Sequence, residues 1–514
     1  MLRELGLTTV FGNPGSTELR FLSQWPDDFR YVMALHEGSA VAMADTYAQL
    51  TGRPVLVSLH SAGGLGNALG TLFTASRNYA PLVVLGGQQT RAMLPGDPFL
   101  SAKDATTFPR PYVKWSVEPA RAADVPRALS RAHAIAGTRP FGPTFVSVPE
   151  DDWDRWAEPF AVRHIVNEPL GDLAALDAVA DALNRARSPV LVVGAGVDRD
   201  GASEAVVELA ERLAVPVWAG ALSSRCGFPE DHPLFAGALA RTRTRVCETL
   251  APYDVVVVLG APVFNYHVHT NGHYIEPGTT LYQLTDDPDV AAAASVGTAI
   301  VTALGPAVAR LLTRVKPSRR TAPARRTPPA VEPGETISIA AFLTTLAEVL
   351  PRDAIVAEEA PSTHTMLHDL LPLRPGAFFT SGSGSLGFGL PAAIGAALAA
   401  PGRRVLALIG DGSVHYGIQG LWNAAQLQLP IAFVIVNNGG YGAMRSFSEL
   451  HGLTDTPSMA VGGVDYLALA QGYGLRGVRV AERARLRAVL EEALHADGPV
   501  LVDVIVDETA EKLY

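Results

Sequence analysis

Short apolar runs rich in valine, leucine and isoleucine alternate along the chain with segments of helical period. Runs of this kind predict strands buried on both faces, which is typical of parallel sheets flanked by helices. Residues 171–188 and 467–475 show the intervening helical pattern. The alternation therefore predicts an α/β fold of doubly wound parallel sheets. The predicted strands lie within residues 53–60, 80–87, 188–196, 254–262, 403–412 and 431–440.

Two stretches show neither the apolar runs of strands nor the helical period, and they divide the chain into three parts. Residues 158–170 lose the pattern, and residues 316–335 are rich in proline and arginine. They predict linkers between three doubly wound parallel-sheet domains, which span 1–160, 171–315 and 336–514. A chain of 514 residues has room for three domains of roughly 150 residues each.

The composition excludes several classes of protein. Apolar residues make up 48% of the chain and charged residues 18%, which excludes wholesale disorder. The formal net charge of −10 argues against nucleic acid as a partner. No apolar run reaches the ~18 residues that cross a membrane, and the first residues do not resemble a signal peptide. Cys226 and Cys247 are too few for a disulfide framework. We therefore expect a cytoplasmic enzyme without nucleic acid or membrane partners.

Polar residues follow two of the predicted strands at the point where each strand ends. Asp411 and Ser413 come after strand 403–409, and Asn438 comes after strand 431–436. The residues between the two ends hold one helical crossover and one strand, so both ends meet at the same edge of a parallel sheet. Side-chain oxygens suit Mg²⁺ or Ca²⁺, and the neighbouring glycines let backbone N–H groups approach an anion. Two ordinary Gly/Asn turns are the alternative.

The GDG…NN pattern at residues 410–438 resembles that of the thiamine diphosphate enzymes. The resemblance implies thiamine diphosphate and Mg²⁺ (or Ca²⁺) as cofactors. It implies that Asp411, the Asn438 side chain and the Gly440 carbonyl hold the metal ion. It also implies that the diphosphate is lined by Gly412, Ser413, Tyr441 and Ser362.

A second motif, His36-Glu37-Gly38, follows an apolar strand and precedes a helix expected to open at about Ser39. Taken alone, Glu37 fits an ordinary surface acid at a turn better than a functional residue. The family resemblance implies that Glu37 lies beside N1′ of the cofactor's aminopyrimidine and activates the cofactor.

Residues 380–399 resemble the family segment that supports the cofactor. The resemblance implies that Leu386 bends the cofactor and that the Gly384 carbonyl faces its 4′-nitrogen. In such enzymes the first domain of one subunit and the third domain of its partner share one cofactor. We therefore expect a homodimer as the minimum and a homotetramer as the assembly.

Further segments are similar to those of benzoylformate decarboxylases, and they cover nearly the whole chain. By this resemblance, Asn13 belongs to the cofactor-binding segment and Ser16 binds the substrate carboxylate. His60 and His267 relay protons. Helix capping by Ser16 and structural roles for the histidines are the alternatives. The segments are 11–19, 59–70, 86–93, 109–120, 151–154, 260–269 and 437–447.

The same resemblance outlines a substrate pocket. Phe447 matches an aromatic wall, and Leu100 lies in a segment that caps the pocket. Thr380 stands where benzoylformate decarboxylases have phenylalanine, so this wall is smaller or more polar. The implied reaction is non-oxidative decarboxylation of an aromatic or bulky, benzoylformate-like 2-oxo acid to an aldehyde and CO₂.

Three other functions compete with this one. An acetolactate synthase-like carboligase would join 2-oxo acids or aldehydes, but His60 and His267 favour protonation and hence decarboxylation. A flavin-linked oxidase would use the glycines of residues 192–201, which are a weak dinucleotide motif. A binding protein without activity would not need Glu37, Asp411 and Asn438 together.

Overall fold

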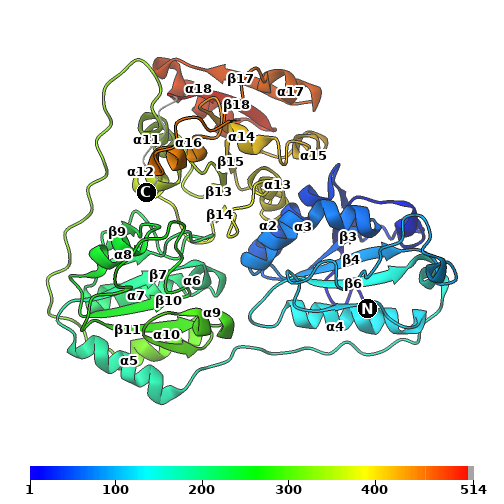
Figure 1. Cartoon of the computed structure of the whole chain (residues 1–514), viewed down its shortest axis with the longest axis horizontal. Coiled ribbons are helices and arrows are strands. Elements are labelled where there is room, and N and C mark those ends of the chain that lie inside the picture. The colour runs from blue at the N-terminus through cyan, green and yellow to red at the C-terminus, as the bar shows by residue number, and fades with distance from the viewer. Residues whose placement is uncertain (458, 508–514) are drawn as a thin grey trace.

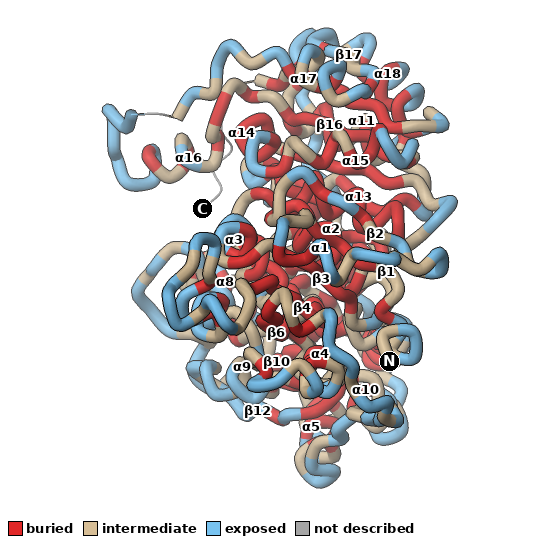
Figure 2. The backbone as a smooth tube through the Cα atoms, turned by 90° about the vertical axis from the view of Figure 1, so that its right-hand side faces the viewer, coloured by how far each residue is buried: buried red, intermediate tan, exposed pale blue. Residues whose placement is uncertain are grey.

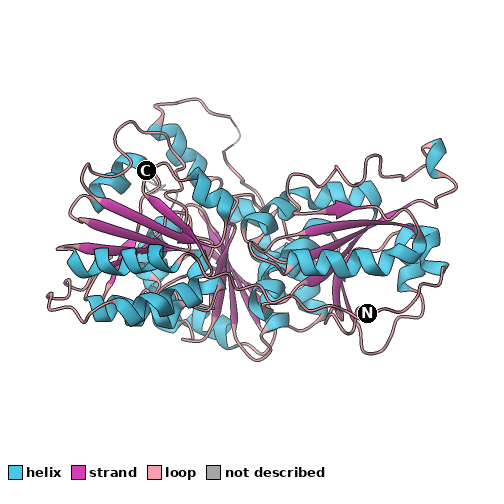
Figure 3. Cartoon of the chain, turned by 90° about the horizontal axis from the view of Figure 1, so that it is seen from below, coloured by secondary structure: helices cyan, strands magenta, loops and turns pink. Residues whose placement is uncertain are grey.

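The computed structural model describes residues 1–457 and 459–507, and its chain forms three lobes (Figure 1). Each lobe is built on one six-stranded sheet. Every strand pair in the three sheets is parallel, and helices cover both faces of the sheets (Figure 3). The predicted α/β class with three doubly wound parallel sheets is therefore confirmed. The last seven residues of the predicted third domain, 508–514, lie outside the described residues.

The first lobe carries the sheet with strand order β2-β1-β3-β4-β6-β5. Its strands are β1 (Thr9–Gly12), β2 (Arg30–Met33), β3 (Val55–Leu59), β4 (Leu82–Gln88), β5 (Ser116–Val117) and β6 (Thr144–Pro149). Its helices are η1 (Ser16–Glu18), α1 (Leu19–Leu22), α2 (Glu37–Thr51), α3 (Ser61–Arg77), η2 (Leu94–Gly96), η3 (Ala122–Asp124), α4 (Val125–Ala136) and η4 (Glu150–Asp154).

The central lobe carries the sheet with strand order β12-β11-β10-β7-β8-β9. Its strands are β7 (Pro189–Val193), β8 (Val217–Ala219), β9 (Phe235–Ala238), β10 (Val255–Leu259), β11 (Thr280–Thr285) and β12 (Thr298–Val301). Its helices are α5 (Leu173–Arg185), α6 (Ala195–Arg199), α7 (Ser203–Leu213), α8 (Arg243–Leu250), α9 (Pro288–Ala293) and α10 (Leu304–Arg314).

The third lobe carries the sheet with strand order β14-β13-β15-β16-β18-β17. Its strands are β13 (Ile355–Glu359), β14 (Phe378–Thr380), β15 (Val405–Gly410), β16 (Ile431–Asn437), β17 (Arg476–Val480) and β18 (Val500–Ile505). Its helices are α11 (Ile339–Val349), α12 (His364–Leu370), α13 (Gly389–Ala399), α14 (Asp411–Val414), α15 (Gly420–Gln426), α16 (Gly442–Leu450), α17 (Tyr466–Gly472) and α18 (Arg483–His495).

The stretches 158–170 and 316–335 contain neither helix nor strand and run between the lobes (Figure 1). Arg320 holds the second stretch, residues 316–335, by hydrogen bonds. The Arg320 guanidinium donates to the Leu183 carbonyl at 3.2 Å and to the Leu213 carbonyl at 3.3 Å. These carbonyls lie in the last turns of α5 and α7, where helical acceptors lack partners. Arg320 therefore attaches this stretch to the central lobe.

The first and third lobes share one hydrophobic core, in which α2 packs on α13. Figure 2 shows the buried backbone continuing through these helices. A Cβ at Gly395 of α13 would collide with the Met43 carbonyl oxygen of α2, so only glycine allows this close approach. The contact fixes the first lobe against the third within one chain. Within the described part of the chain, no helix has both the length and the apolarity to cross a bilayer.

The start of α2 differs from its predicted position. The helix begins at Glu37, two residues before the expected Ser39. His36 is its N-cap, and His36 Nδ1 accepts a hydrogen bond from the Gly38 N–H at 3.1 Å. The imidazole replaces the usual Ser or Asp cap, which explains why the sequence pattern placed the start too late.

Candidate active site

Two strand ends of the third lobe lie side by side. β15 and β16 are paired in register up to Gly410 and Val436. Asp411 follows the first strand as the opening residue of α14, and Asn438 follows the second. The predicted meeting of these two residues at the carboxyl edge of the sheet agrees with this pairing.

Two buried side-chain oxygen atoms at this edge accept no hydrogen bond from the described residues. Asp411 Oδ1 accepts the Gly412 N–H at 2.9 Å. Asp411 Oδ2 and Asn438 Oδ1 are buried and have no hydrogen-bond partner among the described residues. Burial raises the pKa of Asp411 to about 6. An unpaired buried oxygen costs about 1–3 kcal/mol, and a divalent cation would satisfy both oxygens at once.

The donor set fits Mg²⁺ or Ca²⁺ bound together with a phosphate-containing ligand. The described residues hold no group of three or more His, Cys, Asp or Glu side chains that could bind a metal alone. Hard cations accept amide and carbonyl oxygens and often share their shell with phosphates. The Gly440 carbonyl accepts the Gly442 N–H at 2.9 Å, which leaves its second lone pair for such an ion.

The residues predicted to line the diphosphate gather at the same strand ends. A Cβ at Gly412 would lie 2.6 Å from the ring of Tyr441, so glycine lets the backbone approach this ring. A Cβ at Gly442 would lie 3.2 Å from that of Ser362, which comes from the loop after β13. Ser413 is buried on the first turn of α14.

The predicted activating carboxylate occupies the first position of α2. Glu37 is half-buried, and its Oε2 accepts a hydrogen bond from Asn67 Nδ2 at 3.1 Å. A Cβ at Gly64 would lie 3.1 Å from Glu37 Oε1. Asn67 and Gly64 both belong to α3, so this helix orients the carboxylate. Sequence reasoning missed Asn67, although it lies within the resembling segment 59–70.

The loop that is predicted to support the cofactor is held from two lobes. Asn78 Oδ1 accepts the Gly382 N–H at 2.9 Å, and Thr74 Oγ1 lies 2.7 Å from Ser383 Oγ. Both holding residues come from α3 or its end. Gly384 has φ +73°, a conformation that favours glycine. Leu386 is half-buried beside it.

Glu359 holds the other side of this loop. Its carboxylate accepts the N–H groups of Gly387 at 2.8 Å and of Phe388 and Gly389 at 2.6 Å each. These donors open α13, where unpaired N–H groups favour a negative charge. Glu359 therefore fixes the turn directly after Leu386, a role that the sequence reasoning did not assign.

Three predicted residues of the first lobe lie at the ends of β1 and β3, which are paired strands. Asn13 donates to the Ala34 carbonyl at 2.7 Å, and Ser16 is exposed at the start of η1. His60 precedes α3, and its Nδ1 lies 3.0 Å from Glu18 Oε2. The N-cap of η1 is Gly15, and Ser16 is the first residue of this helix.

Leu100 of this lobe contacts Ser61, the residue that follows His60. Its carbonyl accepts a hydrogen bond from the hydroxyl of Ser61. Leu100 has φ +65° and its side chain is exposed. A leucine in this conformation is uncommon and marks a strained loop position.

His267 of the central lobe meets Phe447 of the third lobe. The two ring centroids lie 4.8 Å apart in an edge-to-face arrangement. Burial, followed by the nearby Arg241 charge, lowers the pKa of His267. His267, predicted to relay protons, therefore contacts Phe447, the predicted aromatic wall of the substrate pocket.

Thr380 turns its hydroxyl toward a buried acid. Thr380 Oγ1 donates to Glu358 Oε2 at 2.7 Å, and His364 Nδ1 lies 3.6 Å from the same oxygen. Burial lowers the pKa of His364 to about 4. Thr380, predicted to form part of the substrate pocket, thus belongs to a buried polar network.

The glycines of residues 192–201 have a packing role. A Cβ at Gly196 would lie 2.8 Å from the Gly260 Cα, and a Cβ at Gly194 would lie 2.6 Å from the Ala261 Cβ. The small residues therefore allow two backbones of the central lobe to touch. This packing accounts for the motif without a flavin.

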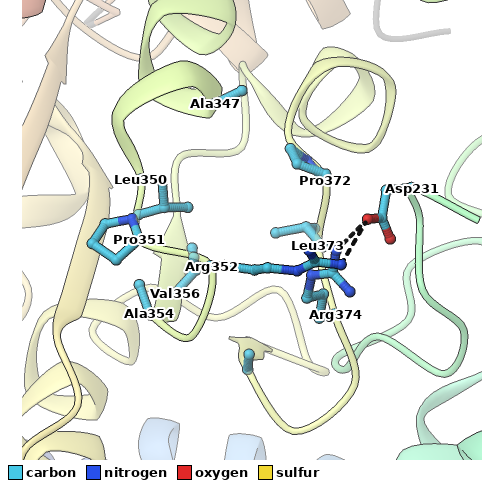
Figure 4. Close-up of a pocket in the computed structure, with 11 residues that line it drawn as sticks. Asp231, Ala347, Leu350, Pro351, Arg352, Ala354, Val356, Pro372, Leu373 and Arg374 are labelled. Carbon is cyan, nitrogen blue, oxygen red and sulfur yellow. Dashed lines mark hydrogen bonds and ion pairs between the residues drawn. The ribbon is translucent and has the colours of Figure 1, made fainter.

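Two cavities lie between the central and third lobes. One, of about 220 Å³, is lined by Asp231, which Arg352 approaches at 3.9 Å and with which Arg374 forms an ion pair (Figure 4). The second, of about 500 Å³, is bordered by Arg325 and Arg326. None of the predicted site residues lines either cavity.

Comparison with known proteins places these features in a family. Three models of thiamine pyrophosphate enzymes match: the N-terminal TPP binding domain over 1–107, the central domain over 176–311 and the C-terminal TPP binding domain over 362–504. The chain is also 44% identical to benzoylformate decarboxylase of Pseudomonas aeruginosa over 98% of this chain and 97% of that protein. The chain belongs to the thiamine pyrophosphate enzyme family.

Solved structures of the family match over the full length. The Rhodococcus jostii RHA1 thiamine diphosphate-dependent 4-hydroxybenzoylformate decarboxylase has a TM-score of 0.96 and 43% identity, covering 99% of this chain and 98% of that one. The benzoylformate decarboxylase of Polynucleobacter necessarius has a TM-score of 0.97 and 37% identity, with the same coverage. An acetolactate synthase large subunit of Parasynechococcus marenigrum is 28% identical, over 98% of this chain and 86% of that protein. The carboligases of the family are therefore more distant relatives than the decarboxylases.

Proposed function

We propose that this chain is a thiamine diphosphate-dependent decarboxylase that converts an aromatic or bulky 2-oxo acid to an aldehyde and CO₂. The observation that carries the proposal concerns two buried oxygens at the edge of the third sheet, Asp411 Oδ2 and Asn438 Oδ1, for which the described part of the chain offers no hydrogen-bond partner. The full-length likeness to benzoylformate decarboxylases supports the reaction type.

The third lobe would hold the cofactor. Asp411, Asn438 and the Gly440 carbonyl would bind Mg²⁺ or Ca²⁺, and the ion would fix the diphosphate. When bound, the cofactor supplies the nucleophilic carbon and the electron sink that decarboxylation of a 2-oxo acid requires. The diphosphate would be lined by Ser362, Gly412, Ser413 and Tyr441. Gly384 and Leu386 would together support the rings of the cofactor.

The first and central lobes would supply the proton chemistry. Asn67 orients Glu37, which would hold a proton at a ring nitrogen of the pyrimidine. The Ser16 hydroxyl would donate a hydrogen bond to the substrate carboxylate, and Asn13 would position the segment that carries it. His60 and His267 would give and take protons at the keto oxygen and at the product carbon, since an imidazole ring can both donate and accept a proton.

The substrate would rest against Phe447 and Leu100. An aromatic and aliphatic wall excludes water and favours an aromatic or bulky side chain on the 2-oxo acid. The Thr380–Glu358 hydrogen bond adds polarity at the position that is phenylalanine in benzoylformate decarboxylases. This polarity supports acceptance of a ring-hydroxylated substrate beside benzoylformate itself.

A second copy of the chain would complete the site. Apolar side chains are exposed next to the site segments, and large exposed apolar groups of this kind mark protein interfaces. We propose a homodimer as the minimum and a homotetramer, located in the cytoplasm, as the assembly. The exposed residues are Leu19 at 61%, Leu35 at 43%, Phe99 at 86%, Tyr416 at 52% and Met444 at 52%.

A panel of 2-oxo acids tests the proposal. The purified chain, supplied with thiamine diphosphate and Mg²⁺, is assayed for CO₂ and aldehyde with benzoylformate, 4-hydroxybenzoylformate, branched-chain 2-oxo acids and pyruvate. Aldehyde and CO₂ in equal amounts from the aromatic acids would support it. Acyloin as the main product would favour the carboligase, and no turnover of any acid would refute the proposed function.

A further inference from the structure

One carboxylate of the first lobe is buried directly against the histidine proposed to relay protons. Glu18 ends η1, and only 2% of its side chain is exposed. Its Oε2 lies 3.0 Å from Nδ1 of His60, whose side chain is 21% exposed. A buried carboxylate is costly unless it is hydrogen-bonded and paired, so the partners of Glu18 decide what it does.

The hydrogen bonds around Glu18 show which nitrogen of His60 carries the hydrogen. The Gly15 N–H donates to Oε2 at 2.9 Å, and the Thr17 hydroxyl donates to Oε1 at 2.7 Å. Thr17 has one hydroxyl hydrogen, so its oxygen, 3.0 Å from His60 Nδ1, can only accept from the ring. Both neighbours of Nδ1 are therefore acceptors. This arrangement places the hydrogen on Nδ1 and leaves the lone pair on Nε2.

Two glycines make room for this pair. A Cβ at Gly87 of β4 would collide with Glu18 Oε1 and with the Thr17 hydroxyl. A Cβ at Gly15 would collide with the imidazole of His60. Gly15 has φ −125°, which any residue can adopt, so space and not backbone conformation requires glycine here.

We propose that Glu18 is a positioning residue that acts through His60. Glu18 holds the ring by Nδ1–H, so that Nε2 is the atom that takes a proton and returns it. While the imidazolium exists, the negative charge of Glu18 stabilises it. The proposal rests on the proposed function, in which His60 moves protons at the substrate.

The substitution Glu18→Gln tests the charge, because the amide keeps one accepting oxygen for the Gly15 N–H and the ring N–H, whereas the position of Oε1 becomes an uncharged NH₂ group. We expect kcat for decarboxylation to fall roughly 10- to 100-fold. We expect KM to change less than about threefold, because the lost interaction belongs to the transition state and not to substrate binding. A change confined to KM would overturn the proposal.

A double-mutant cycle separates action through His60 from a general structural effect. In the His60→Ala background, Glu18→Gln should lower kcat by less than about twofold, because no imidazolium remains to stabilise. Equal losses in both backgrounds would show that Glu18 acts independently. Glu211→Gln is the matched control, since Glu211 pairs with His232 Nε2 at 3.2 Å on the central lobe, and it should retain wild-type kcat.

A spectroscopic readout does not depend on the proposed reaction. Solid-state ¹⁵N NMR of the holoenzyme with labelled histidine, assigned with His60→Gln, should show Nδ1 protonated and Nε2 bare. A hydrogen on Nε2 would overturn the pairing, whatever the enzyme catalyses. If the pairing is found but no 2-oxo acid is decarboxylated, the proposed function fails and the positioning of His60 stands.

Discussion

At the scale of single residues, Asp411 shows a conflict between stability and ligand binding. Its Oδ2 is buried without a hydrogen-bond partner among the described residues, and burial raises the pKa of the carboxyl to about 6. A group that is unfavourable in the free protein and well placed for a cation is typical of a binding site. The same holds for Asn438 Oδ1 on the neighbouring strand end.

Asp411→Asn should therefore separate the two effects. We expect the cofactor-free variant to be as stable as the wild type or more stable by about 1 kcal/mol, because a buried unpaired charge is removed. We expect affinity for thiamine diphosphate with Mg²⁺ to fall roughly 100-fold or more, since a metal-binding charge is lost. Urea unfolding and cofactor titration by fluorescence measure the two quantities. Unchanged cofactor affinity would contradict the proposed metal site.

Glu37 permits a second test at this scale. Glu37→Gln should leave the far-ultraviolet circular dichroism and the cofactor content unchanged, because Gln keeps the hydrogen bond with Asn67. Turnover should fall at least about 100-fold, since the proton at the pyrimidine can no longer be exchanged with a carboxylate. Product formation under saturating cofactor measures the effect, and wild-type turnover would refute the role of Glu37.

At the scale of secondary-structure elements, α2 and α3 connect the first lobe to the loop of the third lobe that is predicted to support the cofactor. Asp45 of α2 is fully buried and accepts from Gln49 Nε2 at 2.5 Å and from Asn78 Nδ2 at 3.0 Å. Asn78 in turn accepts the Gly382 N–H. The position of the loop therefore depends on a hydrogen-bond network that crosses the shared core.

This network predicts a pH dependence of stability. Burial raises the pKa of Asp45 from 3.8 to about 7. Between these two pKa values the Asp45 carboxyl is deprotonated in the unfolded chain but still protonated in the folded chain. The free energy of unfolding therefore falls as the pH rises, by at most about 1.4 kcal/mol per pH unit. Above the folded-state pKa this contribution no longer changes with pH. Relative to Asp45→Asn, the wild type should be most stable below pH 4. Urea midpoints of both proteins at pH 5 and pH 8 measure this, and an equal difference at both pH values would contradict it.

At the scale of the whole molecule, the two groups of site residues belong to different lobes. Glu37 and His60 lie in the first lobe, whereas Asp411 and Asn438 lie in the third. The α2–α13 contact fixes the two lobes against each other within one chain. Exposed apolar residues beside both groups favour completion of each site by a second chain.

Mixed dimers test this arrangement. Glu37→Gln and Asp411→Ala are each expected to be inactive alone. If a site joins the first lobe of one chain to the third lobe of its partner, a mixed dimer has one intact site. Random reassembly of equal amounts should then restore roughly a quarter of wild-type activity. Turnover after co-expression with two affinity tags measures this, and complete inactivity of the purified mixed dimer would contradict a shared site.

The contribution of the sequence differs between the elements. Apolar runs in the sequence predict buried parallel strands, so the bounds of four strands were predicted within a few residues: β3, β10, β15 and β16. The start of α2 was missed because His36 is an unusual cap. Side-chain networks that join distant segments, such as Glu18 with His60 or Asn78 with Gly382, leave no periodic signal in a sequence.

By itself the sequence determined the α/β class, the three parallel sheets and the strand ends that carry Asp411 and Asn438, because local hydrophobic pattern and turn residues dictate these features. Only the tertiary structure decided that Asp411 Oδ2 and Asn438 Oδ1 are buried without hydrogen-bond partners among the described residues. It also decided that Asn67 orients Glu37 and that Glu18 meets Nδ1 of His60. Those facts depend on which side chains meet after folding. Such meetings are set by the packing of whole elements and not by the neighbours of a residue along the chain.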